Sequence, residues 1–343
     1  MVSDLIIAGL AVLVVALRPR SWASTCAAVS LAGLGVVLGG RPDPLGEAVR
    51  TVAPMAAFLL VAVGAAALAV RLGVARGAAR RLGALARGDG HRLFVLVCLV
   101  TVLLTAVVSL DGAVVVMAPI LVELHRKHGA PLRPLLLGVV TVANASSLAL
   151  PEGNPTNLVV IERLGLPLGR AATTMVLPGV IATLLCAAAI GWSQRRALGT
   201  PFVRRETSAA ASPLAPGLFG VLRVVLQIVA LLVVVLPLAG RATVTGAGLP
   251  LMLGVAVGVS LLAALANNLP ASAIVAAGLA SGPAAYAALA GLSVGALATP
   301  QGSVATLIAG DLAGERPHAR VLLPIALAAA LAATVVFWLI SIS

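Results

Sequence analysis

Charged side chains are scarce in this sequence of 343 residues, since only 10% are Asp, Glu, Lys or Arg. So little charge excludes the surface of an ordinary soluble domain, in which about a quarter of the residues are charged. Aromatic residues make up 3%, and the three cysteines, Cys26, Cys98 and Cys186, lie far apart within apolar runs. This spacing gives no disulfide framework and no metal-binding motif, so we expect the cysteines to be small buried hydrophobic side chains.

Apolar residues dominate instead: 61% of the chain is hydrophobic and the mean hydropathy is +1.13. Apolar runs long enough to span a bilayer recur along the whole length, which predicts an all-α polytopic membrane protein in contact with the lipid bilayer. The formal net charge of +12 does not indicate a nucleic-acid partner. Its arginines stand in short loops, and no basic face is interleaved with aromatic residues.

Two of the ten apolar stretches are too long for one crossing and too short for two crossings and a turn. Residues 93–122 and 248–281 each run to about 30 residues, where about 20 suffice. Each has a polar break near its middle, "SLDG" at 109–112 and "ANNLP" at 266–270. We interpret both as re-entrant hairpins. The ten stretches are 5–17, 21–39, 50–70, 93–122, 132–161, 171–192, 217–240, 248–281, 284–310 and 321–341.

The basic residues support this topology, because cytoplasmic loops collect Lys and Arg. With both hairpins re-entrant, 17 basic residues fall on one side and five on the other, with Arg223 left inside a span. We therefore expect eight crossings in the cell membrane, with both termini outside. Trp22, Trp192 and Trp338 then fall near span ends, where amphipathic rings anchor at the interface.

The chain contains an internal repeat. Residues 50–192 and the segment from 217 to 343 both read helix, hairpin, interrupted helix, helix, and the second hairpin enters from the opposite face, which is typical of inverted repeats in transporters. The interruptions match in sequence, "LALPEGNPTNLVV" at 148–160 and "LATPQGSVATLIA" at 297–309. Residues 1–49 are then peripheral N-terminal helices, and 193–216 a cytoplasmic linker.

Irregular backbone at membrane depth leaves polar groups unpaired unless protein, water or a bound ion satisfies them. Pro151 and Pro155 remove helix donors, so half-helix ends become available as ligands. The other interpretations are packing kinks and, for the asparagines, helix capping. We expect the first interruption to lie with the first hairpin tip and the second with the second tip. The candidate substrate- or ion-binding residues are Ser109, Asp111, Glu152, Gly153, Asn154, Thr156, Asn157, Asn267, Asn268, Thr299, Gln301, Gly302, Ser303 and Thr306.

Asp111 and Glu152 are the carboxylates that we place deep in the membrane. An intramembrane acid costs about 2.5 to 3.5 kcal/mol and is a functional candidate by default. Burial favours the protonated form of a carboxyl group, so both are candidate proton carriers. The alternative for each is a locally hydrogen-bonded structural acid. His125 and His128 stand in a basic interfacial loop, where we expect no metal site, and no motif indicates a cofactor.

At these motifs the chain resembles the arsenite permease family of the ion transporter superfamily, which includes sodium-coupled carboxylate symporters and sodium/proton antiporters. "SLDGAVVVMAP" resembles the first hairpin of that family, "ANASSLALPEGNPTNLVV" its first broken helix, "NNLPAS" its second hairpin and "ATPQGSVATL" its second broken helix. The resemblance implies two inverted repeats around a central site, and homodimeric assembly in many relatives. Leu110 precedes Asp111 where arsenite permeases usually have Asn, and Ser293 and Leu297 replace an acid and a lysine.

These observations favour a secondary active transporter over an enzyme, since no cluster of His, Cys and acids marks a catalytic centre. The leading hypothesis is proton-coupled efflux of arsenite or a similar small metalloid or anion by antiport, as in arsenical resistance. The alternatives are a sodium-coupled carboxylate or anion symporter and a sodium/proton antiporter of the same superfamily. A passive channel is a further alternative, although paired broken helices suit alternating access better.

Overall fold

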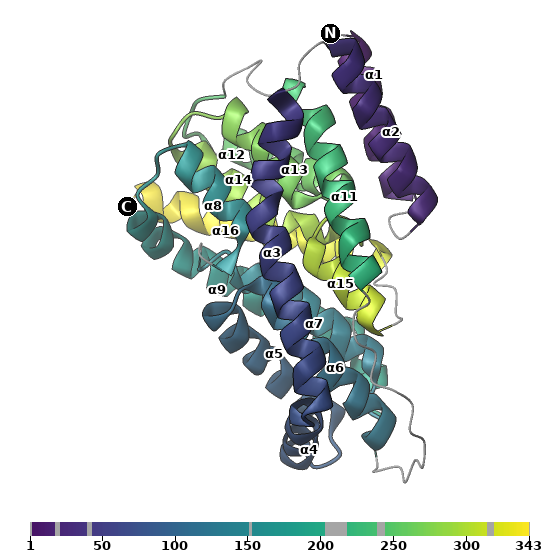
Figure 1. Ribbon diagram of the computed structural model, residues 1–343. Helices are drawn as coiled ribbons and strands as arrows, with labels where there is room; N and C mark the ends of the chain where they lie inside the picture. The colour runs from purple at the N-terminus through teal and green to yellow at the C-terminus, as the bar shows by residue number, and fades with distance from the viewer. Residues whose placement is uncertain are drawn as a thin grey trace.

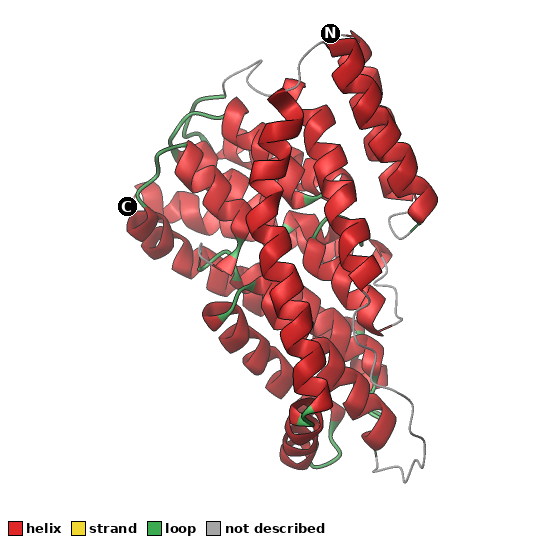
Figure 2. Ribbon diagram, in the orientation of Figure 1, coloured by secondary structure: helices red, strands yellow, loops and turns green. Residues whose placement is uncertain are grey.

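The computed structural model describes residues 2–17, 21–39, 43–150, 153–202, 218–238, 244–313 and 319–342. Apart from one isolated bridge between Val244 and Leu279, the regular structure within these ranges is helical (Figure 2), which confirms the all-α polytopic fold. The elements are α1 (Val2–Leu17), α2 (Trp22–Gly39), α3 (Asp43–Arg71), α4 (Val74–Ala86), α5 (Gly90–Val107), α6 (Leu110–His128), α7 (Leu132–Ser146), α8 (Pro155–Arg163), α9 (Leu168–Ser193), α10 (Arg195–Leu198), α11 (Leu218–Val235), η2 (Leu236–Leu238), α12 (Leu249–Ala266), α13 (Asn268–Gly278), α14 (Pro283–Ser293), η3 (Gly295–Ala298), α15 (Val304–Ala313) and α16 (Ala319–Ile342).

Six helices in the described ranges are long and apolar enough to cross a membrane. They coincide with α3, α5, α9, α11, α12 and α16. Two of these, α5 and α12, are the first arms of the predicted hairpins. The helices of the predicted interrupted spans, α7, α8, α14 and α15, are each too short to cross alone. The chain is therefore a multi-pass membrane protein.

Both predicted hairpins break where the sequence places its polar residues. The backbone turns at Ser109, with φ 143°, and at Asn267, with φ 75°, which are unusual values for residues other than glycine. Each side chain then caps the helix that follows. Ser109 Oγ accepts from Gly112 N at 3.2 Å, and Asn267 Oδ1 accepts from Leu269 N at 3.2 Å. The arms pack against each other, α5 on α6 and α12 on α13.

The same order of elements occurs twice. A long helix, two hairpin arms, an interrupted helix and a final long helix run from α3 to α9 and again from α11 to α16, with α4 inserted only in the first set and η2 and η3 only in the second. The first long helix begins at Asp43, so the predicted boundary between residues 49 and 50 falls inside α3. The predicted linker at 193–216 contains the short helix α10, and its residues 203–216 lie outside the described ranges.

The packing divides into two layers. The helices α1, α2, α3 and α11 share one apolar cluster, which includes Leu59 and Leu231. They lie along one side of the molecule, with α1 and α2 at its edge beside α11 (Figure 1). This layer meets the rest of the protein at α6, α13 and α15, through residues such as Val115, Leu269 and Val304. It therefore covers the second arm of each hairpin and the second half-helix.

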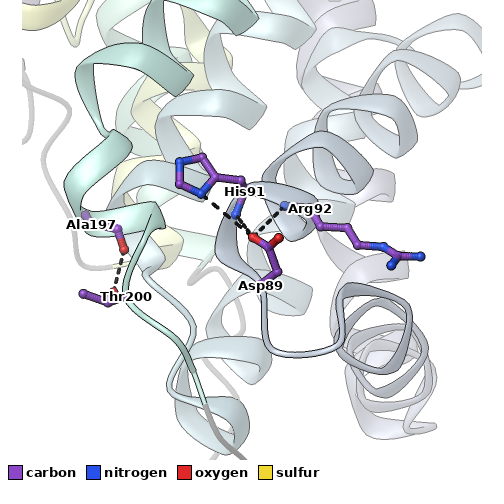
Figure 3. A network of polar contacts seen from close by, with 5 residues as sticks. All are labelled: Asp89, His91, Arg92, Ala197 and Thr200. Carbon is purple, nitrogen blue, oxygen red and sulfur yellow. Dashed lines mark hydrogen bonds and ion pairs between the residues drawn. The ribbon is translucent and has the colours of Figure 1, made fainter.

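Local hydrogen bonds fix the start of α5, which begins within the basic segment 71–92. The Asp89 carboxylate accepts from the backbone of His91 at 2.8 Å and of Arg92 at 3.2 Å, which is an N-cap (Figure 3). Thr200 follows α10 and donates to Ala197 O at 2.7 Å. The Asp89 cap therefore fixes the first turn of α5, the first arm of the predicted first hairpin.

The cysteine prediction holds for two residues of three. Cys98 and Cys186 are buried, whereas Cys26 is exposed. Cys26 lies in α2, which contacts the rest of the protein only through α1 and α11 among the larger helix contacts. A residue on the outer face of a peripheral apolar helix has no protein to cover it, and apolar sequence alone does not distinguish that face from a buried one.

Candidate functional site

The second hairpin tip is bonded directly to the second interruption. Asn268 N donates to Gly302 O at 2.8 Å, and Asn267 Nδ2 donates to Gln301 O at 2.7 Å. Thr299 Oγ1 donates to Ala264 O at the end of the first arm. The irregular chain between η3 and α15 thus satisfies part of its backbone through the hairpin, as the sequence predicts for this tip.

Two glycines permit close approach between each interruption and the first arm of its own hairpin. A Cβ on Gly302 would lie 2.0 Å from Ala296 O and 3.1 Å from Ala264 Cα. A Cβ on Gly153 would lie 3.1 Å from Thr105 O, close to the end of α5. Each interruption therefore lies against the first arm of its own hairpin. The space at Gly302 is the tighter of the two and leaves no room for a side chain.

The first interruption is held by a polar network that reaches into the second repeat. Asn154 caps α8, and its Oδ1 accepts from Thr156 N at 3.0 Å and from Thr156 Oγ1 at 2.6 Å. Its Nδ2 donates to Ser147 Oγ at 3.2 Å and to Ser293 Oγ at 3.3 Å. Ser293 in turn donates to Asn157 Oδ1 at 2.9 Å, and Asn157 Nδ2 donates to Ser147 O at 3.4 Å. In the part of the candidate site around the first interruption, every side-chain amide group therefore has a hydrogen-bond partner.

The half-helices after the interruptions pack crosswise. The helix α8 contacts α13 of the second hairpin, and α15 contacts α6 of the first. As a result Asp111, at the start of α6, lies at the N-terminal end of α15, where the backbone amide of Ala305 approaches its carboxyl group as a donor. The first turn of α15 therefore presents a backbone donor to the Asp111 carboxyl group.

Five buried polar atoms on α6, α7, the second hairpin and the beginning of α15 have no hydrogen-bond partner within the described part of the chain. They belong to side chains that are at most 4% exposed, on α6, α7, the second hairpin and α15. The helix α15 packs on both α6 and α7, and Asn268 adjoins it through Gly302. A buried polar atom without a partner costs about 1 to 3 kcal/mol, and a bound molecule, ion or water would supply the missing hydrogen bonds. The atoms are Asp111 Oδ1, Asn144 Oδ1, Asn268 Oδ1, Ser303 Oγ and Thr306 Oγ1.

The predicted site residues thus fall into two unequal halves. Ser109 and Asn267 cap the hairpins, and Asn154, Thr156 and Asn157 form the paired half, while Gln301 is 6% exposed and supplies its carbonyl to the second tip. Glu152, predicted as a second proton carrier, lies outside the described residues, as does Pro151. Asp111 is therefore the acid that the described site contains.

Sequence reasoning missed three polar residues of the site. Ser147 and Ser293 complete the paired half, and Asn144 contributes to the unpaired half. All three are 0% exposed. Each is a polar residue within an apolar helix or directly after it, next to an interruption, and that position alone does not distinguish a site residue from one that bonds to its own helix. None of the site residues named in these paragraphs is Lys, Arg or His.

An all-helical membrane fold with paired hairpins and paired helix interruptions around buried polar residues defines a secondary transporter rather than an enzyme. The chain belongs to the citrate transporter family CitMHS, whose family model matches residues 2–332. The resemblance to arsenite permeases, drawn from four motifs, is therefore correct at the level of the transporter class, and the matching family is that of the citrate transporters.

Two curated proteins show local similarity. A silicon efflux transporter of Oryza sativa subsp. japonica is 42% identical over 84 residues, which are 24% of this chain and 17% of that protein. The protein arsB of Dictyostelium discoideum, described as a transporter, is 32% identical over 70 residues, 20% of this chain and 12% of that protein. The aligned segments thus span less than a fifth of either relative.

Proposed function

We propose that this protein exports a small, uncharged, hydroxylated metalloid, of the chemical class of arsenous and silicic acids, in exchange for protons. The observation that carries the proposal is the set of five unpaired atoms around Asp111 and α15. Two of them, the amide oxygens Asn144 Oδ1 and Asn268 Oδ1, can only accept hydrogen bonds, and Asp111 Oδ1 can only accept when Asp111 is ionised. Their natural ligand must therefore supply donors.

A metalloid hydroxide fits this requirement, because each of its hydroxyl groups can donate to one of these oxygens. Ser303 Oγ and Thr306 Oγ1 can donate as well as accept, so they match the hydroxyl oxygens of the same molecule. The carboxylate groups of a carboxylate substrate only accept hydrogen bonds, and they would face three acceptors without a basic side chain to balance their charge. The efflux transporter for silicon among the relatives is consistent with this chemistry.

Asp111 supplies the coupling in this proposal. Its side chain is 4% exposed, and the site residues described above contain no cation to balance its charge. Protonation removes both the buried charge and one unpaired acceptor, so proton binding and substrate binding compete for the same oxygen. Competition of this kind at one site produces antiport, since each ligand leaves as the other arrives. Glu152 remains a second candidate carrier.

A second function is favoured by the same five oxygens, because hard cations take carboxylate, amide and hydroxyl oxygens as ligands. On this alternative, sodium binds beside Asp111 and its charge holds a carboxylate substrate, as the description of the matching family suggests. The protein is then a sodium-coupled carboxylate or anion symporter, or a sodium/proton antiporter. The two proposals differ in coupling ion and substrate charge.

Transport into sealed proteoliposomes separates them. The purified protein is reconstituted, and uptake of radiolabelled arsenite, germanic acid as a silicic acid analogue, and citrate is compared under a pH gradient alone and a sodium gradient alone. We expect arsenite or germanic acid to accumulate with the pH gradient, without sodium and without citrate transport. Citrate uptake that requires sodium and ignores the pH gradient would replace the proposal by the alternative.

A further inference from the structure

A groove lies between α4 and the first hairpin, outside the candidate transport site. Its volume is about 620 Å³, within the range of small-molecule pockets, about 300 to 1,000 Å³. Apolar side chains from three helices line it, among them Val74 and Leu82 of α4, Val100 of α5 and Ile120 of α6. Arg80 and Arg81 line it too. The groove therefore combines an apolar wall with two guanidinium groups.

One face of α4 packs against the rest of the protein, and the exposed part of the helix carries its arginines. Ala75, Ala79, Leu82 and Ala86 are buried, and α4 packs with this face mainly on α6 and α5. The arginines of α4 are exposed. Figure 1 shows α4 beyond the end of α3, next to the ends of α5 and α6, so the arginines stand where these helices reach the basic end of the molecule.

The two parts of the groove lie at different depths. Val100 follows Gly90, the first residue of α5, by ten positions, which is about 15 Å along a helix. That distance matches half of the hydrocarbon core of a bilayer, which is about 30 Å thick in all. Leu99 and Leu103 beside Val100 are 57% and 65% exposed, so the apolar end of the groove opens towards the lipid-facing side of α5. Its basic end is at headgroup level.

We propose that this groove binds an anionic phospholipid, with one acyl chain against Val100 and Ile120 and the phosphate between Arg80 and Arg81. Apolar depth and a basic rim together match a lipid, whereas a soluble phosphate would use the rim alone. Guanidinium groups bind phosphate oxygens with paired donors, which suits the headgroup.

The charge balance at this end favours an anionic headgroup over a zwitterionic one. Residues 71–92 contain six arginines and one acid, Asp89, and Asp89 caps α5. Within the described residues neither Arg80 nor Arg81 takes part in an ion pair. A lipid phosphate with an additional net negative charge supplies the counter-ion that the protein itself does not provide there.

The test measures lipid retained by the intact protein in detergent, by native mass spectrometry, after equilibration with phosphatidylglycerol or phosphatidylcholine. The double variant Arg80→Gln with Arg81→Gln is compared with Arg87→Gln plus Arg92→Gln, which removes the same charge from the same segment outside the groove. At about 1 kcal/mol for each arginine, we expect the first pair to weaken phosphatidylglycerol retention about 30-fold. The control variant, Arg87→Gln with Arg92→Gln, should weaken phosphatidylglycerol retention several-fold less. Equal losses of phosphatidylglycerol retention in both double variants would show that general surface charge alone is responsible and would contradict the proposed site.

A second variant tests the apolar part without touching charge. A Cβ on Gly77 meets nothing within 4 Å, and Gly77 lines the groove, so Gly77→Leu places a side chain in the groove from an open position and adds helix propensity. We expect this variant to fold and to lose phosphatidylglycerol while both arginines remain. Undiminished retention, or equal stabilisation of the protein by glycerol 3-phosphate alone, would show a headgroup site without an acyl chain and contradict the proposal.

Discussion

Ser293 donates its hydroxyl hydrogen to Asn157 Oδ1 at 2.9 Å, although 136 residues separate them. Asn157 belongs to the first half-helix and Ser293 ends α14 in the second repeat. Both side chains are at most 1% exposed. The two repeats are therefore joined at the first interruption by a buried polar bond, and breaking it leaves Asn157 Oδ1 without a partner.

Ser293→Ala should destabilise the protein by about 1 to 3 kcal/mol and lower transport, because Asn157 Oδ1 and one donor bond of Asn154 lose their partner. Thermal unfolding and proteoliposome uptake measure the two effects. Thr334→Val is the control, since the Thr334 hydroxyl is buried and bonded only to Ala330 O of its own helix. If both variants behave alike, Ser293 contributes nothing beyond an ordinary buried hydroxyl.

Asn154 and Asn268 should respond differently to replacement by alanine. Asn154→Ala removes four hydrogen bonds of the paired half, so we expect loss of both stability and transport. Asn268→Ala removes an oxygen that has no partner within the described residues, so stability should not fall while transport is abolished. A strongly destabilised Asn268→Ala variant, or one that transports fully, would show that this oxygen is not a ligand.

The sequence predicted the fold well where polar residues interrupt apolar runs. The breaks at Ser109 and Asn267 and the interruptions at Gly153 and Gly302 all fall where prolines, asparagines and glycines stand in otherwise apolar stretches, because such residues stop helices in any environment. The start of α3 at Asp43 was missed by seven positions, since Asp43, Pro44 and Glu47 suggest a loop although Asp and Pro also suit the first turn of a helix.

The pairing of half-helices with the opposite repeat was not predictable from one sequence. Periodicity tells which face of α15 is buried, but not that Asp111 and Ala305 meet, because they are nearly 200 positions apart and no local rule links them. Asn144 and Ser293 were missed for the same reason. Each is a single polar residue in an apolar helix, and only the packing distinguishes a residue that binds across the repeats from one that bonds to its own helix.

Gly302→Ala should prevent correct assembly of the second interruption. Its Cβ would lie 2.0 Å from Ala296 O, a backbone atom that cannot move alone, and overpacking of this kind costs about 1 to 3 kcal/mol or more. Gly153→Ala meets Thr105 O at 3.1 Å, so a smaller loss is expected. Gly254→Ala, with nothing within 4 Å, is the neutral control. Thermal unfolding in detergent ranks the three, and a stable Gly302→Ala variant would contradict the packing described above.

We predict that residues 71–92 and 123–133 face the same, cytoplasmic side, because both are basic and the first hairpin returns between them. Single cysteines at Ala84 and Lys127, both exposed, should share their labelling by an impermeant thiol reagent in intact cells. The background requires Cys26→Ala, since Cys26 is exposed. Opposite labelling of the two cysteines would end the re-entrant topology and the inverted repeat that depends on it.

Asp111→Asn tests the coupling mechanism most directly. The amide keeps the shape and a hydrogen-bonding group at the start of α6 but cannot take up a proton. Accumulation driven by a pH gradient should therefore be lost, because no proton is exchanged for substrate at this position. Exchange of labelled for unlabelled substrate at equal concentrations needs no proton and should persist. Glu162→Gln, which neutralises an exposed acid at the end of α8, is the matched control and should transport normally.

The two assays together assign the role of Asp111. Loss of gradient-driven uptake with exchange preserved identifies a coupling residue, because substrate still binds and crosses. Loss of both would make Asp111 a ligand whose charge the substrate or a cation requires, and restoration by sodium would then favour the sodium-coupled alternative. If Asp111→Asn still concentrates substrate on a pH gradient alone, the proton must travel elsewhere. Glu152→Gln in the same background then becomes the decisive variant, because it removes the second carboxyl group that the sequence places beside the first interruption.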